Sequence, residues 1–278
     1  MTPLEFTLLI ALISVSAGLL GSLVGVGGGI IVVPALTLLM GVDIRSAIAA
    51  SIVAVIATSS GAASGYVRQR LSNLRLAMLL ETTTALGAVC GALLAAAVSG
   101  RALTLLFGMV LVYTAWSMSR KPSHAARELP QDALADRLRL HGSYFDKVLG
   151  REIVYRVSRT PVGLAVSYVA GMLSGLLGIG GGVLKVPVMN LAMGIPLKVC
   201  TATSNFMIGV TAAAGAAVYF MRGDVNPFIA APVAVGVLLG AKIGSRLLGH
   251  LHSHWIRVAF VAVLLVTAIQ MLWKGVHP

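Results

Sequence analysis

A ten-residue glycine-rich segment occurs twice in this chain, and this repeat restricts the possible folds more than any other feature. Gly-Val-Gly-Gly-Gly-Ile-Ile-Val-Val-Pro runs from Gly25 to Pro34, and Gly-Ile-Gly-Gly-Gly-Val-Leu-Lys-Val-Pro begins 153 residues later and runs from Gly178 to Pro187. The same offset relates Gly41 to Gly194, Ser51 to Ser204, Thr58 to Thr211, Tyr66 to Tyr219, Gly87 to Gly240, Gly91 to Gly244 and Phe107 to Phe260. The sequence therefore predicts two copies of one unit of about a hundred residues, joined by a linker.

The composition indicates a membrane protein. Hydrophobic residues make up 58% of the chain and charged residues 11%, whereas soluble domains carry about 25% charged residues. Uncharged runs near or above the roughly 18 residues that mark a membrane span cover 6–42, 46–67, 82–100, 102–119, 160–184 and 199–221. We expect an all-α, polytopic membrane protein. The basic residues behind the net charge of +12 fall between these runs, which favours cytoplasmic loops over a nucleic-acid-binding surface.

Each glycine-rich segment is predicted to interrupt a membrane helix. Three consecutive glycines weaken a helix, and proline is best tolerated near a helix start. We therefore expect a helix over 6–24, extended backbone over 27–33 and a half-helix over 34–40 in the first copy. The second copy is expected to have a helix over 160–177, a break over 178–182 and a half-helix over 187–193. Half-helices of about 10 Å cannot span the bilayer. Close helix packing through glycine is the alternative, but a glycine triplet followed by a proline favours the break.

The other apolar segments complete each copy. The first repeat, residues 1–118, has further long segments at 46–66, 76–98 and 102–118, and the second repeat, residues 160–278, has them at 199–220, 227–248 and 256–272. The linker, residues 119–159, is predicted to hold a short amphipathic helix over 130–140 and a β-hairpin around Leu149 and Gly150. A spacer, a regulatory element and a partner surface all fit this linker.

Loop charges predict opposite orientations for the two copies. One loop of the first copy carries Arg68, Arg70 and Arg75, and the linker carries nine Lys/Arg against five acids, so both are expected in the cytoplasm. The matching loop of the second copy holds only Arg222 and Asp224 and is expected outside, as are both chain termini. An inverted-topology repeat with paired broken helices is typical of secondary transporters.

The paired breaks are the predicted binding site for a small anion. Free backbone N–H groups at a helix start, together with glycines that permit close approach, supply positive potential without a charged pore. Two such sites related by a pseudo-two-fold axis would meet near the middle of the membrane. The residues of this predicted site are Gly27, Gly28, Gly29 and Pro34 in the first copy and Gly180, Gly181, Gly182 and Pro187 in the second.

Two charged side chains are predicted to lie within the membrane. Lys185 stands in the broken segment where the first copy has Val32, and an ionisable residue at this depth indicates a substrate-facing role. Extension of its ammonium group to a membrane interface is the alternative. Glu81 is the one acid well inside a predicted span, and it either carries a coupling proton or pairs with Arg75.

A stripe of polar side chains is predicted to line a path beside the breaks. Seven-residue spacing returns side chains to one helical face. The stripe consists of Thr201, Ser204, Asn205 and Thr211 in the second copy, matched by Ser51 and Thr58 in the first. Hydroxyl groups that bond carbonyls of their own helix are the alternative.

The sequence predicts no cofactor, no metal site and no enzyme active centre. Cys90 and Cys200 both lie in apolar runs, so no disulfide or metal framework follows. The three histidines of the 250–254 run are expected in a loop without a coordinating fold around them. No predicted span pairs a nucleophile with a histidine or aspartate base, which argues against an intramembrane enzyme.

The doubled Gly-x-Gly-Gly-Gly-x-x-x-Val-Pro motif, each copy followed by a serine-containing helix, resembles the sulfite exporter TauE/SafE family of membrane transporters over residues 5–118 and 160–274. The resemblance implies transport of small sulfur-containing or related organic anions, such as sulfite, thiosulfate and sulfonates, across the bacterial inner membrane. Together with the predicted inverted repeat, it leads us to expect alternating access, with the anion held at the paired breaks. The expected partners are this anion and the lipid bilayer, with no nucleic acid. A second copy of the chain, in a homodimer, is a further candidate partner. A passive anion channel on the same fold is the alternative function.

Overall fold

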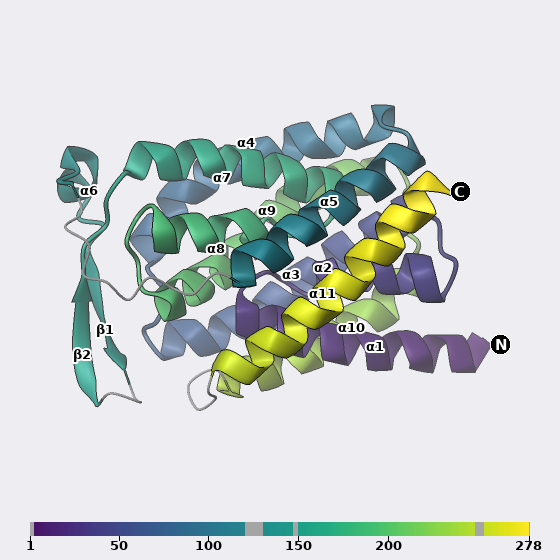
Figure 1. Ribbon diagram of the computed structural model, residues 1–278, viewed down its shortest axis with the longest axis horizontal. Helices are drawn as coiled ribbons and strands as arrows, with labels where there is room; N and C mark the ends of the chain where they lie inside the picture. The colour runs from purple at the N-terminus through teal and green to yellow at the C-terminus, as the bar shows by residue number, and fades with distance from the viewer. Residues whose placement is uncertain (1–2, 120–129, 147–149, 248–252, 278) are drawn as a thin grey trace.

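The computed structural model describes residues 3–119, 130–146, 150–247 and 253–277, which form a helical bundle with a small structured linker at one end (Figure 1). The elements in chain order are α1 (Pro3–Val24), α2 (Gly29–Pro34), the π-helical segment η1 (Ala35–Leu39), α3 (Ile44–Arg68), α4 (Leu74–Ala97), α5 (Gly100–Ser119), α6 (Ala133–Arg137), β1 (Gly142–Asp146), β2 (Arg151–Tyr155), α7 (Thr160–Leu177), α8 (Gly182–Leu191), α9 (Leu197–Met221), α10 (Pro227–Leu247) and α11 (Ser253–Val276).

The bundle has two ends, which we call the linker end and the terminal end. The elements α6, β1 and β2 cover the linker end, while the start of α1 and the end of α11 lie at the terminal end (Figure 1). Contacts between the ends of helices also mark the terminal end. Arg45 Nη2 donates to the carbonyl of Val98 (2.9 Å), and Arg101 Nε donates to the carbonyl of Gly275 (2.9 Å).

Long apolar helices dominate the structure, as expected for an all-α, polytopic membrane protein. Among the described residues, 7 helices (α1, α3, α4, α5, α7, α9 and α10) are long and apolar enough to cross a membrane. Their bounds lie within a few residues of the predicted segments. Side-chain caps fix two of the starts, because the Asp43 carboxylate accepts from the amides of Arg45 and Ser46, and the Asn73 side chain accepts from the amide of Leu76.

Both glycine-rich breaks are confirmed, and glycine is needed to form them. Gly25 and Gly27 have φ values of 80° and 86°, and Gly178, Gly180 and Gly181 have 70°, 76° and 72°. This left-handed region is favourable for glycine, which has no Cβ. Each long helix therefore stops at its glycines and does not continue into the half-helix.

The half-helices begin earlier than predicted. The expected extended backbone over 27–33 is wrong, since α2 begins at Gly29, and α8 begins at Gly182 instead of Pro187. Each proline therefore lies inside its helix, where it removes one N–H donor. Membrane proteins tolerate such a proline because neighbouring groups and local π-type turns adjust around it, and the chain after Pro34 does widen into η1. The positive-φ glycines, not the prolines, set where these helices start.

Matched helix pairs join the two copies. Helix α1 packs along α10, and α7, which matches α1, packs along α4, which matches α10. At these contacts Gly240 lies against the carbonyl of Val15, and Gly87 lies against the carbonyl of Tyr168, so the same contact is made twice. Helix backbones approach this closely only where the facing residues are small. Helices α3 and α9 pack against each other between these pairs.

The linker forms the predicted helix and hairpin. Strands β1 and β2 pair antiparallel, with Gly142 opposite Tyr155 and Asp146 opposite Arg151, and the residues between them, 147–149, lie outside the described residues. Helix α6 is shorter than the predicted 130–140. Asp132 caps its start, and the Asp132 carboxylate also accepts from the amide of Thr160 (2.6 Å), the first residue of α7.

The glycine contacts predict a large effect of one added methyl group. We expect Gly171→Ala to lower the free energy of unfolding by about 1–3 kcal/mol, because the new methyl would overlap the carbonyl of Thr84 and push α7 away from α4. Gly215→Ala in α9 is the matched control, since its methyl would lie 3.7 Å from the nearest atom. The control should be neutral or stabilising by about 0.5–1 kcal/mol. Equilibrium unfolding in detergent micelles measures both, and equal losses would contradict this account of the packing.

Candidate functional site

The two glycine-rich breaks meet inside the bundle through a reciprocal pair of hydrogen bonds. Ser51 Oγ in α3 donates to the carbonyl of Gly178, and Ser204 Oγ in α9 donates to the carbonyl of Gly25, both at 2.7 Å. All four residues are buried. Each serine thus belongs to one copy and satisfies a carbonyl where the helix of the other copy ends. The predicted meeting of the breaks is confirmed.

The first residue of each half-helix lies directly on the opposite break. Gly29 lies against the carbonyl of Gly178, and Gly182 lies against the carbonyl of Gly25. A Cβ at either glycine would also press on the hydroxyl of Ser51 or Ser204. The third glycine of each triplet is therefore required for contact between the copies.

A second pair of matched hydrogen bonds, one within each copy, was not foreseen from the sequence. Tyr66 OH donates to the carbonyl of Ser22 (3.0 Å), and Tyr219 OH donates to the carbonyl of Gly175 (2.8 Å). Both tyrosines are buried, and they stabilise the last turns of α1 and α7 just before the breaks. The repeat offset relates the two tyrosines to each other, and that relation was the signal available in the sequence.

Part of the predicted polar stripe is used to hold helices together. Asn205 Nδ2 donates to the carbonyls of Ser22 (2.9 Å) and Thr201 (3.1 Å), while Thr58 Oγ1 donates to the carbonyl of Ala54 in its own helix (2.8 Å). For Thr58 the structure therefore shows the alternative, a hydroxyl that bonds a carbonyl of its own helix. Asn205 Oδ1 is buried and has no hydrogen-bond partner among the described residues.

Lys185, Thr211 and Glu81 form a buried polar cluster that joins α8, α9 and α4. Thr211 Oγ1 donates to Glu81 Oε1 at 2.6 Å and accepts from Lys185 Nζ at 3.2 Å. Lys185 Nζ lies 3.9 Å from Glu81 Oε2. The threonine hydroxyl therefore lies between the two charges and bonds to both.

The cluster is almost completely shielded. Lys185 is 1% exposed and Glu81 is 9% exposed. Glu81 Oε2 makes no hydrogen bond with the described residues. A buried ion pair is stable only when the opposite charge and good hydrogen bonds offset the loss of water. Loss of either charged partner would leave the other uncompensated.

The cluster excludes one alternative for each of the two charged side chains. Lys185 does not extend to an interface, because its side chain is buried beside Gly181, in the first turn of α8 and not in extended backbone. Glu81 pairs with Lys185 and not with Arg75, whose Nη1 donates to the carbonyl of Arg139 in the linker (3.3 Å).

The charges occur in only one copy. The repeat offset relates Lys185 to Val32 and Glu81 to Ala234, whereas Thr211 has its match in Thr58. The backbone geometry at the breaks is therefore duplicated, but the cation and the carboxylate are not. An anion that needs an ammonium partner would find it beside the second break.

The predicted prolines do not belong to this cluster. Pro34 and Pro187 lie within the half-helices, away from the Ser–carbonyl bonds. Of the 250–254 run, residues 250–252 lie outside the described residues. Within the described residues, no three His, Cys, Asp or Glu side chains come close enough to hold a metal ion.

Removal of one hydroxyl tests the cluster. We expect Thr211→Val to lower the free energy of unfolding by about 1–3 kcal/mol, because the buried Glu81 carboxylate would lose its donor. Thr58→Val is the matched control at the same position of the first copy, where the hydroxyl bonds only its own helix. Chemical unfolding in detergent compares the two variants. Equal effects would show that the hydroxyl does not stabilise the charge pair.

Several known proteins are similar to this chain in sequence. The Bacillus subtilis probable membrane transporter protein YunE is 28% identical over 98% of this chain and 99% of its own. A probable membrane transporter protein of Xylella fastidiosa is 27% identical over 94% of each chain. The Arabidopsis thaliana sulfite exporter TauE/SafE family protein 6 is 29% identical over 38% of this chain and 24% of its own. No solved structure matches the chain. Since the sulfite exporter TauE/SafE family model matches residues 10–271, nearly the whole chain, this multi-pass membrane protein belongs to that family of transporters.

Proposed function

We propose that this transporter carries small sulfur-containing or related organic anions, such as sulfite, thiosulfate or a sulfonate, by alternating access. The anion is held beside the second glycine break by the ammonium group of Lys185, the hydroxyl of Thr211 and the free amides of Gly180–Gly182. Glu81 carries the coupling proton. The buried contact of Lys185, Thr211 and Glu81 is the observation that carries this proposal.

The position of Lys185 supports an anion-binding role. A Cβ at Gly181 would lie 3.4 Å from Lys185 Cε, which is van der Waals contact. The lysine side chain therefore runs alongside the break. The amides at the start of α8 have no intrahelical acceptor and carry partial positive charge. An anion in this place would meet a full charge and a helix start together.

Charge balance supports the proposed role of Glu81. In the described state the single ammonium of Lys185 is balanced by the single carboxylate of Glu81. An added anion would leave the buried cluster with net negative charge, which is strongly unfavourable where the dielectric constant is low. Protonation of Glu81 removes this excess charge and frees Lys185 for the anion. Anion binding and proton uptake are thereby linked.

The courses of the half-helices support alternating access through inverted repeats. From the meeting point of the breaks, α2 and η1 lead towards Asp43 at the terminal end, whereas α8 leads towards Met193, whose carbonyl accepts from the amide of Ser158 in the linker (3.2 Å). The matched half-helices therefore point to opposite ends of the bundle. Transporters of this kind open each side in turn around a fixed central site.

Loss of the ammonium group tests the proposal directly. We expect Lys185→Met to weaken anion binding by about tenfold or more, because a charge acts strongly at low dielectric. The measurement is titration calorimetry or ligand-induced thermal stabilisation with sulfite, thiosulfate and methanesulfonate. Lys242→Met, which removes a lysine from a surface cleft near the linker end, is the control and should bind like the wild type.

A second arm of the same experiment separates binding from coupling. Glu81→Gln imitates the protonated acid, so this variant should bind the anion with an affinity that no longer depends on pH. Wild-type affinity in Lys185→Met would place anion binding elsewhere. An unchanged pH dependence in Glu81→Gln would remove Glu81 from the coupling step.

Cysteine labelling tests the proposed orientation. In a variant without the two native cysteines, we expect Ser99→Cys at the terminal end to react with an impermeant maleimide added outside intact cells. Arg151→Cys in β2 should react only after the membrane is opened, because the positive-inside rule places the basic linker in the cytoplasm. Both positions are exposed in the structure. Labelling of Arg151→Cys from outside would reverse the orientation.

A further inference from the structure

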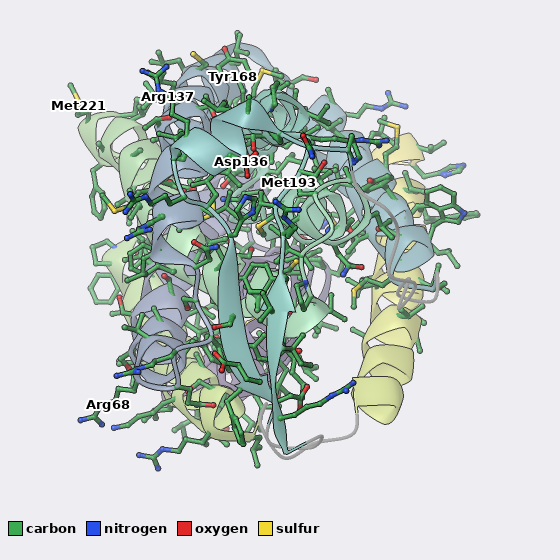
Figure 2. All side chains as sticks on the ribbon, turned by 90° about the vertical axis from the view of Figure 1, so that its left-hand side faces the viewer. Arg68, Asp136, Arg137, Tyr168, Met193 and Met221 are labelled. Atoms are coloured by element: carbon green, nitrogen blue, oxygen red, sulfur yellow. The ribbon has the colours of Figure 1, made fainter. Side chains whose placement is uncertain are left out.

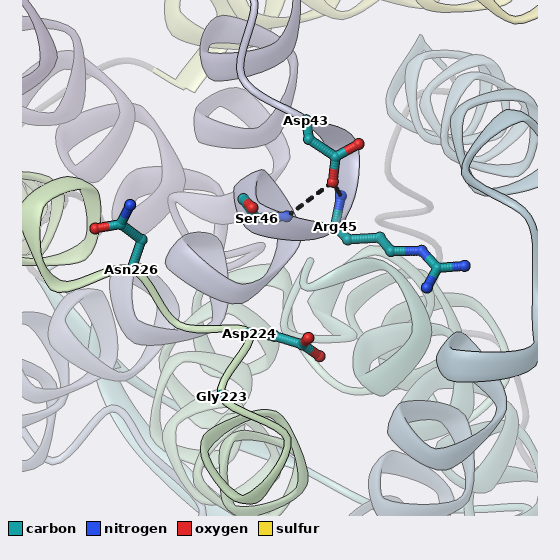
Figure 3. Close-up of a pocket in the computed structure, with 6 residues that line it drawn as sticks. All are labelled: Asp43, Arg45, Ser46, Gly223, Asp224 and Asn226. Atoms are coloured by element: carbon teal, nitrogen blue, oxygen red, sulfur yellow. Dashed lines mark hydrogen bonds between the residues drawn. The ribbon is translucent and has the colours of Figure 1, made fainter.

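A cleft of about 490 Å³ opens at the terminal end of the bundle (Figure 3). It lies between the start of α3 and the connection from α9 to α10, and its lining residues are Asp43, Arg45, Ser46, Gly223, Asp224 and Asn226. Two of these residues are carboxylates that belong to the walls themselves. The cleft therefore contains the Arg45 side chain and two acids of the connections, of which Asp43 caps α3 and Asp224 pairs with Arg222 at 2.9 Å.

The repeat offset places a matching set of positions at the linker end. These positions are Pro196, Lys198 and Val199 at the start of α9, and Arg70, Leu71 and Asn73 between α3 and α4. Lys198 takes the place of Arg45, but Pro196 and Leu71 take the places of the two aspartates. The matching walls thus keep the cation and have no carboxylate of their own.

The linker covers these matching positions, which we call the linker-end mouth. Lys198 Nζ contacts both carboxylate oxygens of Asp146, at 2.9 and 3.0 Å. Asn73 Nδ2 donates to the carbonyl of Leu140 (2.7 Å) and to the hydroxyl of Tyr155 (3.1 Å). Figure 2 faces the linker end and shows both strands lying across the end of the bundle. The polar groups that match the open cleft are therefore bound to the linker.

The apolar contacts show that this mouth is built to be covered. Leu71 and Val199 belong to one buried hydrophobic cluster with Leu140 and Tyr155 of the linker. The corresponding positions of the open cleft hold the polar residues Asp224 and Ser46. An apolar wall at a membrane-protein entrance gains stability when another apolar surface covers it. The two positions are therefore apolar where the linker covers them and polar where the cleft is open.

Asp146 is held in place as an anion in this mouth. The residue is only 5% exposed, whereas the side chain of Lys198 is 35% exposed, so solutes can reach the ammonium group. Tyr144 OH lies 3.4 Å from Asp146 Oδ2 and donates to it. Burial, followed by the negative charge of Asp146, raises the pKa of Tyr144 to about 12, so this hydroxyl remains a donor at neutral pH.

We propose that Lys198 is an anion-binding residue at the linker-end mouth of the transport path, and that Asp146 takes the place of the anion there while the linker is docked. The inference rests on the proposed function, since the ligand is a small oxyanion of the transported class. When the anion exchanges with the carboxylate, the charge of Lys198 stays balanced while the linker is released. The pair is exposed on the Lys198 side, which lets an anion approach the lysine before Asp146 is released.

Hydrogen exchange in β1 and β2 tests this proposal on the full-length protein in nanodiscs. The probe is sodium methanesulfonate, compared with sodium chloride at equal ionic strength. In the wild type, methanesulfonate should speed exchange of the hairpin amides by up to about fivefold, the size expected for loss of a partly exposed ion pair. In Lys198→Gln this response should be absent, because the anion has no ammonium to bind.

Two further variants complete the test. Asp146→Asn should show fast hairpin exchange without any added anion. Asp136→Asn is the matched control, since its carboxylate bonds to His141 within the linker (2.7 Å) and should leave the anion response intact. A wild-type hairpin that does not respond to methanesulfonate, or a Lys198→Gln hairpin that responds as the wild type does, would overturn the proposal.

The transport site is tested separately from the mouth. Lys185→Met should lose transport in proteoliposomes while its hairpin still responds to methanesulfonate. Absence of transport in every form, with a hairpin that responds, would count against the proposed function alone. Transport without a hairpin response would count against the assignment of Lys198 and Asp146 alone.

Discussion

This structure depends on one requirement: backbone groups that are shielded from water must find a hydrogen-bond partner within the protein. A helix that ends inside an apolar bundle exposes carbonyls that cost several kcal/mol each when they stay unpaired. Here Ser51 and Ser204 meet that need at Gly178 and Gly25. The long helices, the glycine contacts between α1 and α10 and between α4 and α7, and the buried tyrosines all serve to hold α3 and α9 where these two serines reach the breaks.

The backbone contacts of the two copies are matched, but the buried charges are not. The serine bonds and the tyrosine bonds are duplicated, whereas Lys185 and Glu81 have Val32 and Ala234 as their matches. A related contrast appears at the two ends, where the walls of the open cleft include two carboxylates, whereas Lys198 contacts a carboxylate of the linker. The repeats determine the backbone geometry of the breaks, and residues present in only one copy provide the charged groups.

Sequence patterns predicted the parts of this fold that local chemistry decides. The bounds of α7 were predicted at both ends, because an apolar run begins at Thr160-Pro161 and stops at Gly178. The half-helix starts were missed, because proline gave the stronger local signal while positive-φ glycines set the actual start. The pairing of Glu81 with Lys185 was also missed. It depends on how α4, α8 and α9 pack, and only the local alternative, Arg75, was visible along the chain.

The reciprocal serine bonds also determine when, during synthesis of the chain, the first break can gain its hydrogen-bond partner. Ser204 lies 179 residues after Gly25, whose carbonyl it binds. At a typical elongation rate of roughly 5–20 residues per second, the first break waits about 10–40 s before its partner leaves the ribosome. The first five helices therefore enter the membrane with a carbonyl that only the second copy can satisfy. Early release of the chain, or its cutting within the linker during this interval, would leave the first copy with an unpaired group in an apolar environment.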